Sequence, residues 1–461
     1  MSDSFVANRR GWLILAADLV LFFLLLRWLP FSPTENRGLA LLIFVGVLWL
    51  TEAFHITVTS LMIPLFAIGL GVLSTKAAFA PFAEPVIFMF FGGFVIAAVL
   101  HIQKLDLWIA GHVIRLSRGS LRLVVVNLFV VTAFLSLFVN NTAVAAMMLP
   151  LTLGILQPVD AQKNRKLYSF VLMGVAFSAS IGGIGTLVGS TPNALLATMV
   201  DISFADWLKY GMPVVLLLMP AMVLALWLVL RPDFNVPFKV EFEDIPLTGK
   251  RRFTLAVFAI TAVLLIFGKL VGGALQQLLA LPEAIRNIDS VIAMLAVVVM
   301  CVGGSASWKQ IQDHTEWGVL MLFGGGLALS IVMQQTGASK VLADNIVAAV
   351  GQQHLVIIML VLTAFVVMLT EFTSNTATAA LLMPIFISVA RTLGQPDIAL
   401  AAIIACGASC AFMLPIATPP NAIVYATGKI ELGEMIRVGL LLNVACILVI
   451  GLLAYFFWLH W

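Results

Sequence analysis

Two short polar motifs occur twice in this chain, in the same order, inside long apolar runs. Asn140-Asn141-Thr142 is followed further along by Ser190-Thr191-Pro192-Asn193, and Ser374-Asn375-Thr376 is followed by Thr418-Pro419-Pro420-Asn421. Unpaired polar groups are costly inside an apolar segment, so a sequence that repeats them indicates one site built from two related halves. In membrane transporters, internal repeats of this kind enclose a central substrate.

The composition supports a helical membrane protein. Of the 461 residues, 62% are hydrophobic and only 10% are charged, which is too little charge for a soluble domain of this size. The apolar runs are continuous and long enough to cross a bilayer as helices, whereas a β-barrel would show short alternating segments. We therefore predict an all-α polytopic membrane protein that lies in the lipid bilayer. No basic run suggests that nucleic acid is a partner.

Hydropathy predicts about eleven transmembrane helices. The predicted spans are 12–31, 38–54, 58–73, 85–103, 168–200, 207–230, 254–272, 288–303, 317–335, 398–426 and 435–458. Two further apolar segments, 121–156 and 353–390, each carry a polar motif near the middle. We interpret each as a re-entrant helical hairpin, because non-helical backbone at membrane depth is tolerated only where protein or a wet cavity covers it. A pair of crossings is the alternative for each segment.

Three segments of the first half match three segments of the second half, in the same order. The matched pairs are Glu84–Gly93 with Glu316–Gly325, Asn141–Pro150 with Asn375–Pro384, and Pro192–Ala194 with Pro420–Ala422. The number of spans in each unit is odd, so we predict an inverted-topology internal repeat. The two hairpins then open to opposite sides, and their tips meet near the midplane of the membrane.

The predicted organisation has four parts. They are an N-terminal helix in 1–36, a first repeat in 37–231, a cytoplasmic linker in 232–252 and a second repeat in 253–461. Each repeat contains scaffold helices, one of the hairpins, and one helix that is broken at proline, in 168–200 or 398–426.

The distribution of charge orients this arrangement. With the N-terminus in the cytoplasm, most of the 25 lysine and arginine residues fall on the cytoplasmic side, Arg118 and Lys239 among them, as the positive-inside rule requires. The C-terminus is then external. Short loops favour a bacterial inner (plasma) membrane. Residues 105–120 predict an amphipathic helix in the membrane interface, and 338–350 occupy the equivalent place in the second half.

The repeated motifs suit an anion bound together with cations. A hairpin tip and a broken helix both leave backbone groups unpaired. The N–H groups suit carboxylates or other oxyanions, and the carbonyl, Asn, Ser and Thr oxygens suit Na⁺. The motifs contain no Lys or Arg, so a buried dianion would be uncompensated unless cations bound with it. Cation-coupled anion transport follows, with plain interhelical hydrogen bonding as the alternative.

Other residues have simpler interpretations. Glu371 is expected to bond a nearby donor, with a cation or proton role as the alternative, and Glu84 and Glu316 are expected at helix starts. Gly182-Gly183-Ile184-Gly185 is not followed by a lysine, so close helix packing is favoured over a nucleotide loop. The four cysteines have no metal-like spacing. No hydrolase or ATP-binding motif is present, so we expect neither an enzyme nor a primary pump.

These motifs resemble the divalent-anion/sodium symporter family, the INDY-type sodium-coupled dicarboxylate transporters. The resemblance covers nearly the whole chain and implies a substrate site between two sodium sites. The implied substrate residues are Asn141, Thr142, Ser190, Asn375, Thr376, Thr418 and Pro419. The implied sodium ligands are Ser136, Asn140, Asn141 and the Gly189 carbonyl in one site, and Thr370, Thr373, Asn375 and the Ala417 carbonyl in the other.

The resemblance also implies a homodimer and an elevator-type movement, in which hairpins and broken helices carry the site past a scaffold. One position departs from the family, because Asn140 stands where serine is usual.

We predict Na⁺-coupled symport of C4-dicarboxylates such as succinate, malate or fumarate. The alternatives are sulfate or citrate as substrate, or dicarboxylate exchange without Na⁺. From other classes, an anion channel and an intramembrane hydrolase are the rivals.

Overall fold

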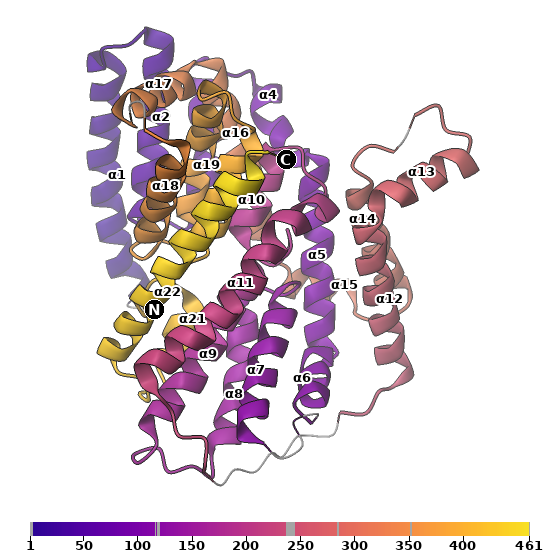
Figure 1. Ribbon diagram of the computed structural model, residues 1–461. Coiled ribbons are helices and arrows are strands. Elements are labelled where there is room, and N and C mark those ends of the chain that lie inside the picture. The colour runs from indigo at the N-terminus through magenta and orange to yellow at the C-terminus, as the bar shows by residue number, and fades with distance from the viewer. Residues whose placement is uncertain are drawn as a thin grey trace.

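The computed structural model describes residues 3–115, 117, 120–236, 245–283, 285–350 and 353–460, and every regular element in them is helical (Figure 1). The elements are α1 (Asp3–Trp28), α2 (Pro33–Leu50), α3 (Ile56–Gly69), α4 (Thr75–Phe79), η1 (Ala80–Ala83), α5 (Pro85–Ile102), α6 (Leu105–Arg115), α7 (Leu121–Ser136), α8 (Asn141–Leu156), α9 (Arg165–Gly183), α10 (Thr191–Met199), α11 (Phe204–Leu230), α12 (Gly249–Ile266), α13 (Gly268–Leu278), α14 (Ile288–Val302), α15 (Trp308–His314), α16 (Trp317–Gln335), α17 (Ala338–Val350), α18 (Leu355–Thr370), α19 (Asn375–Thr392), α20 (Asp397–Gly407), α21 (Pro419–Tyr425), α22 (Leu432–Leu453) and the π-helical turn η2 (Ala454–Trp458). Arg118, Lys239 and residues 237–244 of the predicted linker lie outside the described residues.

Six helices in the described part of the chain are long and apolar enough to cross a membrane, and the bent pair α12–α13 makes a seventh if it counts as one span. Shorter apolar helices, including α3, α7, α8, α14, α18 and α20, accompany them. Many large hydrophobic side chains on the outside of the bundle are exposed, as expected for a surface that faces lipid tails. The prediction of an all-helical membrane protein is confirmed.

The two halves repeat one order of elements. Each contains an amphipathic helix (α6 or α17), a helical hairpin (α7–α8 or α18–α19), a broken helix (α9–α10 or α20–α21) and a long helix (α11 or α22). The hairpins turn at residues 137–140 and 371–374, and the breaks span 184–190 and 408–418. A helical hairpin and a helix break therefore occur in each half, and the re-entrant path of the hairpins stays a prediction. The boundaries of the four predicted parts stay a prediction.

Proline and asparagine together shape each break. Pro192 is the second residue of α10, and Pro419 and Pro420 are the first two residues of α21, positions where the backbone N–H has no partner within the helix. The next residue in each motif is a fully buried asparagine. The Asn193 amide donates to three carbonyls of its break at 3.0, 3.1 and 2.8 Å. The Asn421 amide donates to two, both at 3.1 Å. These side chains replace the hydrogen bonds that the helix gives up.

The short halves of the broken helices pack on elements of the opposite repeat. Helix α10 contacts α19 and α20, and α21 contacts α8 and α9. The hydroxyl oxygens of Ser190 and Ser409 lie 2.9 Å apart, and the rings of Phe177 and Phe412 are 5.0 Å apart in a T-shaped pair. This interlocking joins α7–α11 and α18–α22 into one group of helices, called the hairpin body below. It brings all four polar motifs to one place.

A second group of helices, called the scaffold body below, comprises α1–α5 and α12–α16. Its closest pairs are α5 with α14, α3 with α16, and α1 with α2. Figure 1 shows α12, α13 and α14 at one side of the bundle, with α13 turned across the end of α12. The angle between α12 and α13 is 88°. The predicted span 254–272 therefore ends at Ile266. Gly268 lies at the bend, where a Cβ would come 2.6 Å from the Asp289 carboxylate.

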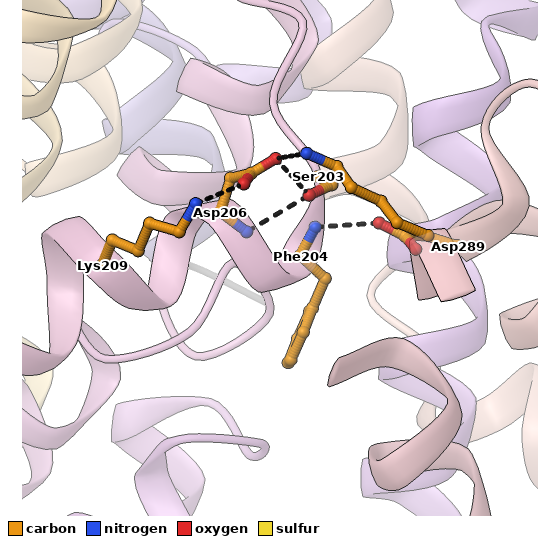
Figure 2. Close-up of polar contacts among 6 residues, drawn as sticks. Ser203, Phe204, Asp206, Lys209 and Asp289 are labelled. Atoms are coloured by element: carbon orange, nitrogen blue, oxygen red, sulfur yellow. Dashed lines mark hydrogen bonds and ion pairs between the residues drawn. The ribbon is translucent and has the colours of Figure 1, made fainter. Parts of the chain in front are cut away.

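A polar cluster ties the two bodies together where α11 begins (Figure 2). The backbone N–H of Phe204 donates to Asp289 of α14 at 2.8 Å. The Asp206 carboxylate pairs with Lys209 at 2.9 Å and with Lys269 of α13 at 2.7 Å. Asp289 thus satisfies an N–H group that the first turn of α11 leaves without a helical partner. The start of α11 is anchored to both α13 and α14.

Close helix packing depends on glycine at several points. A Cβ at Gly182 would lie 2.3 Å from the carbonyl oxygen of Ala133, so the glycine-rich segment packs against α7, as predicted. In α22, a Cβ at Gly439 would lie 2.4 Å from the carbonyl oxygen of Phe412, whereas Gly433 has nothing within 4 Å.

We expect Gly439→Ala to destabilise the protein by about 1–3 kcal/mol, because backbone atoms at the break of the second half would have to move. Gly433→Ala is the matched control in the same helix, and it should leave the thermal unfolding temperature in detergent unchanged. Equal unfolding temperatures for both variants would contradict the close packing of α22 on this break.

Candidate functional site

The four polar motifs line one cavity of about 190 Å³ between the two hairpin tips and the two breaks. All seven residues predicted to contact substrate border it: Asn141, Thr142, Ser190, Asn375, Thr376, Thr418 and Pro419. Three of the predicted sodium ligands that are not in that set, Asn140, Gly189 and Ala417, border it as well. Residues from both repeats are therefore gathered around a single space.

Four helices start at this cavity, namely α8, α10, α19 and α21. The Asn140 side chain caps α8 by accepting from the N–H of Thr142 at 2.8 Å. Ser374 caps α19 by accepting from the N–H of Ala377 at 3.2 Å. The starts of α8 and α19 carry the positive ends of long helix dipoles, which favour a bound anion.

The cavity wall contains little charge. Among the described residues that line it, none is a lysine or arginine, and Glu316 is the one acidic side chain. The potential donors are Asn, Ser and Thr side chains and the N–H groups of helix starts. A dianion bound here would find no cationic side chain to compensate it, which is the condition under which co-bound cations are required.

A cluster of oxygen atoms lies below the first hairpin tip. Ser136 Oγ lies 2.6 Å from both Asn141 Oδ1 and the Ala179 carbonyl oxygen, and its single O–H can donate to only one of them. With the O–H on the Ala179 carbonyl, Asn141 Oδ1 faces only acceptors. In the reversed orientation, the Asn141 amide nitrogen would donate to Ala179, Ser136 and the Gly189 carbonyl at 3.1, 2.6 and 3.2 Å. In that orientation three oxygens, from Ser136, Ala179 and Gly189, surround the Asn141 amide nitrogen, and hydroxyl and carbonyl oxygens are also ligands that hard cations prefer.

The second hairpin tip repeats the arrangement. Thr370 Oγ1 lies 2.9 Å from Asn375 Oδ1 and 2.8 Å from the Ala408 carbonyl oxygen, and its single O–H can donate to only one of them. Thr370 and Asn375 are the repeat counterparts of Ser136 and Asn141. Thr373 differs from the expectation, because its hydroxyl bonds Thr378 at 2.6 Å and the Leu369 carbonyl at 3.1 Å. The structure therefore brings Thr370 and Asn375 together but directs the Thr373 hydroxyl elsewhere.

Glu371 supports the break of the second half. It is 1% exposed, and it accepts from the backbone N–H groups of Phe412 at 2.7 Å, Met413 at 2.9 Å and Leu414 at 3.2 Å. The amide of Asn443 donates to it at 2.6 Å. The predicted partnership with nearby donors is confirmed, and the carboxylate holds the break that lies between α20 and α21.

Sequence reasoning placed Glu316 at a helix start, and it is the N-cap residue of α16. It did not place Glu316 at the cavity, where the carboxylate accepts from the Asn140 amide at 3.2 Å. Phe94 and Val319 of the scaffold body also line the cavity and were not predicted. Nothing in the local sequence could reveal these positions, because they depend on how the scaffold body faces the hairpin tip.

The fold and the cavity define a multi-pass membrane transporter, and the comparisons agree. A family model described as CitMHS, citrate transporter, matches residues 46–396 and 290–461. An uncharacterized transporter of Haemophilus influenzae is 52% identical over 98% of both chains. The sodium-dependent dicarboxylate transporter SdcS of Staphylococcus saprophyticus is 32% identical over 95% of this chain and 89% of its own. The chain belongs to the CitMHS citrate transporter family and, with SdcS, to the divalent-anion/sodium symporters.

A solved structure has a similar fold. The YdaH transporter of Alcanivorax borkumensis superposes with a TM-score of 0.60 over 92% of this chain and 99% of its own, at 15% sequence identity. This likeness concerns the fold alone.

Proposed function

We propose that the chain is a secondary active transporter that couples the entry of Na⁺ to the uptake of C4-dicarboxylates such as succinate, malate or fumarate. The proposal rests on one observation: both copies of the repeated motifs line one cavity. Among the described residues, no lysine or arginine lines this cavity. SdcS, the relative from S. saprophyticus, is named as a sodium-dependent dicarboxylate transporter.

The substrate site is proposed to hold one carboxylate at each hairpin tip. Asn141, Thr142 and Ser190 would bind one end, and Thr376 and Thr418 would bind the other together with the Asn375 amide. Uncharged donors at helix starts compensate a carboxylate only in part. Bound cations would remove the remaining penalty. Each net positive charge that moves inward also gains about 2.3 kcal/mol per 100 mV of membrane potential.

Two oxygen clusters are proposed as the sodium sites. Ser136, Asn141 and the Gly189 carbonyl would form the first, with the Ala179 carbonyl as a further ligand suggested by the geometry. Asn140 would act there through its side chain or backbone. Thr370, Asn375 and the Ala417 carbonyl would form the second, and the Ala408 carbonyl takes the place of the Thr373 hydroxyl.

Movement of the hairpin body past the scaffold body is the proposed transport step. The scaffold body contributes only Phe94, Glu316 and Val319 to the cavity wall, so the hairpin body could carry nearly the whole site with it. The homodimer, the bacterial inner membrane and the cytoplasmic N-terminus with an external C-terminus belong to the same proposal. They rest on the family resemblance and the positive-inside rule.

The experiment that tests the function is uptake of labelled succinate by proteoliposomes, with an inward Na⁺ gradient compared with an equal K⁺ gradient. Concentrative uptake with Na⁺ alone supports the symporter. Exchange of preloaded dicarboxylate without Na⁺ would make the protein an antiporter. Uptake of sulfate or citrate in place of succinate would change the substrate but keep the class. The family name points to citrate, so citrate is the second substrate to test.

We expect Thr370→Ala to raise the Na⁺ concentration for half-maximal uptake by about tenfold, because one ligand and its hydrogen bond to Asn375 are lost. Thr363→Ala is the matched control. Thr363 is a buried threonine of the same helix, and its hydroxyl bonds only the Met359 carbonyl of its own helix at 2.6 Å. If both variants show the same Na⁺ dependence, Thr370 is not part of a sodium site.

A further inference from the structure

Glu316 is the one charged side chain among the described residues that line the substrate cavity. Its position is unexpected for an anion site, since a carboxylate repels a bound anion. Glu316 is the exposed N-cap residue of α16, and its side chain makes no capping hydrogen bond to that helix. Its Oε1 atom instead accepts from the Asn140 amide at 3.2 Å. The carboxylate is therefore held toward the first hairpin tip.

Asn140 makes two contacts at once. Its Oδ1 accepts from the N–H of Thr142 and caps α8, while its Nδ2 donates to Glu316. A serine at this position could cap the helix in the same way. A serine hydroxyl could also donate its O–H while it caps the helix, but its oxygen lies one bond closer to the backbone than the Asn140 amide nitrogen, so it reaches less far toward Glu316. The asparagine in the first motif is thus coupled to the glutamate across the two bodies.

The repeat supplies an internal comparison. Glu84 is the counterpart of Glu316, and it is also an exposed N-cap residue without a side-chain cap bond, at the start of α5. Glu84 does not line the cavity. Both glutamates lie at helix starts, but of the two, Glu316 lines the cavity. Glu316 is therefore the one whose charge would interact with a bound substrate.

We propose that Glu316 determines specificity by substrate charge, favouring dianions over trianions. This inference rests on the proposed function of the same site. The repulsion between Glu316 and a substrate grows with each further negative charge on the substrate. A bound dicarboxylate would carry two charges in the cavity that Glu316 lines, and the third carboxylate of citrate would add one more charge for Glu316 to repel. A repulsive group of this kind discriminates between partners that the attractive donors would bind alike.

The test compares citrate and succinate in the same vesicles, at mildly alkaline pH, where citrate is a trianion and succinate a dianion. The measured quantity is the ratio of kcat/KM for citrate to kcat/KM for succinate under an inward Na⁺ gradient. We expect Glu316→Gln to raise this ratio by about five- to tenfold, mainly through a lower KM for citrate. Glu316→Asp keeps the charge and should stay near the wild-type ratio. Glu84→Gln, the matched control, should equal the wild type.

The outcomes separate this inference from the function beneath it. If the wild type takes up succinate with Na⁺ and Glu316→Gln leaves the ratio unchanged, the inference is wrong and the proposed function stands. A wild type that prefers citrate also overturns the inference. If the wild-type protein neither transports nor binds citrate or succinate in the presence of Na⁺, the proposed function is wrong, and so is this inference. Succinate uptake by each variant shows that the variant is folded.

Discussion

Asn375→Ala is expected to reduce Na⁺-driven succinate uptake at least about 100-fold, because the side chain serves two purposes at once. Asn375 lines the substrate cavity, and its Oδ1 accepts from Thr370 at 2.9 Å in the second oxygen cluster. If the proposed site is right, truncation removes a substrate contact and a cation ligand together. Asn141 occupies the equivalent place in the first repeat, so Asn141→Ala should have an effect of the same size.

Asn345→Ala is the control for both substitutions. Asn345 is an exposed asparagine of α17, away from the cavity, and its amide bonds the Val341 carbonyl at 2.7 Å. All three variants should purify as monodisperse protein with similar unfolding temperatures. Normal uptake by either Asn141→Ala or Asn375→Ala would show that the two motifs do not form one site.

Glu371→Ala is expected to cost about 3–5 kcal/mol of stability, because it leaves several buried donors without an acceptor. Three backbone N–H groups of the break in the second half and the Asn443 amide all point at this carboxylate. For a chain of this length, that loss lowers the unfolding temperature by roughly 5 °C. Glu371→Gln should fall between the wild type and Glu371→Ala, because its amide keeps one acceptor oxygen.

The measurement is thermal unfolding of the purified protein in detergent, with and without Na⁺ and succinate. Glu84→Ala serves as the control, because Glu84 is exposed and makes no side-chain cap bond. An unfolding temperature for Glu371→Ala equal to that of Glu84→Ala would contradict the structural role. If Glu371→Ala lost uptake with unchanged stability, the result would instead favour a role for Glu371 in binding a cation or proton, the alternative raised by the sequence.

Much of the site could be predicted because its polar residues interrupt segments that are otherwise apolar. Asn141, Asn375 and their neighbours are polar residues inside apolar runs, and prolines mark the breaks. Such features are costly in a membrane and are kept where a cavity needs them. Asn193 and Asn421 belong to the same motifs, but both bond the carbonyls of the breaks. The sequence shows that polar residues are present at these positions, but it does not show which neighbouring groups they form hydrogen bonds with.

The features that could not be predicted depend on packing between distant segments. Glu316 meets Asn140, which lies 176 residues earlier, because α16 of the scaffold body faces the first hairpin tip. The bend after Ile266 interrupts a continuous apolar run, at the point where Gly268 approaches Asp289 of α14. Thr373 is one turn from Thr370, yet its hydroxyl bonds Thr378. Local composition carries no signal for any of these contacts.

The central claim is that two repeated motifs form one Na⁺-dependent carboxylate site. The most direct test is calorimetric titration of succinate into the purified protein, in NaCl and in an equal concentration of choline chloride. We predict one succinate bound per chain in Na⁺ and no measurable binding in choline. Two succinates per chain, or equal affinity in both salts, would contradict the claim.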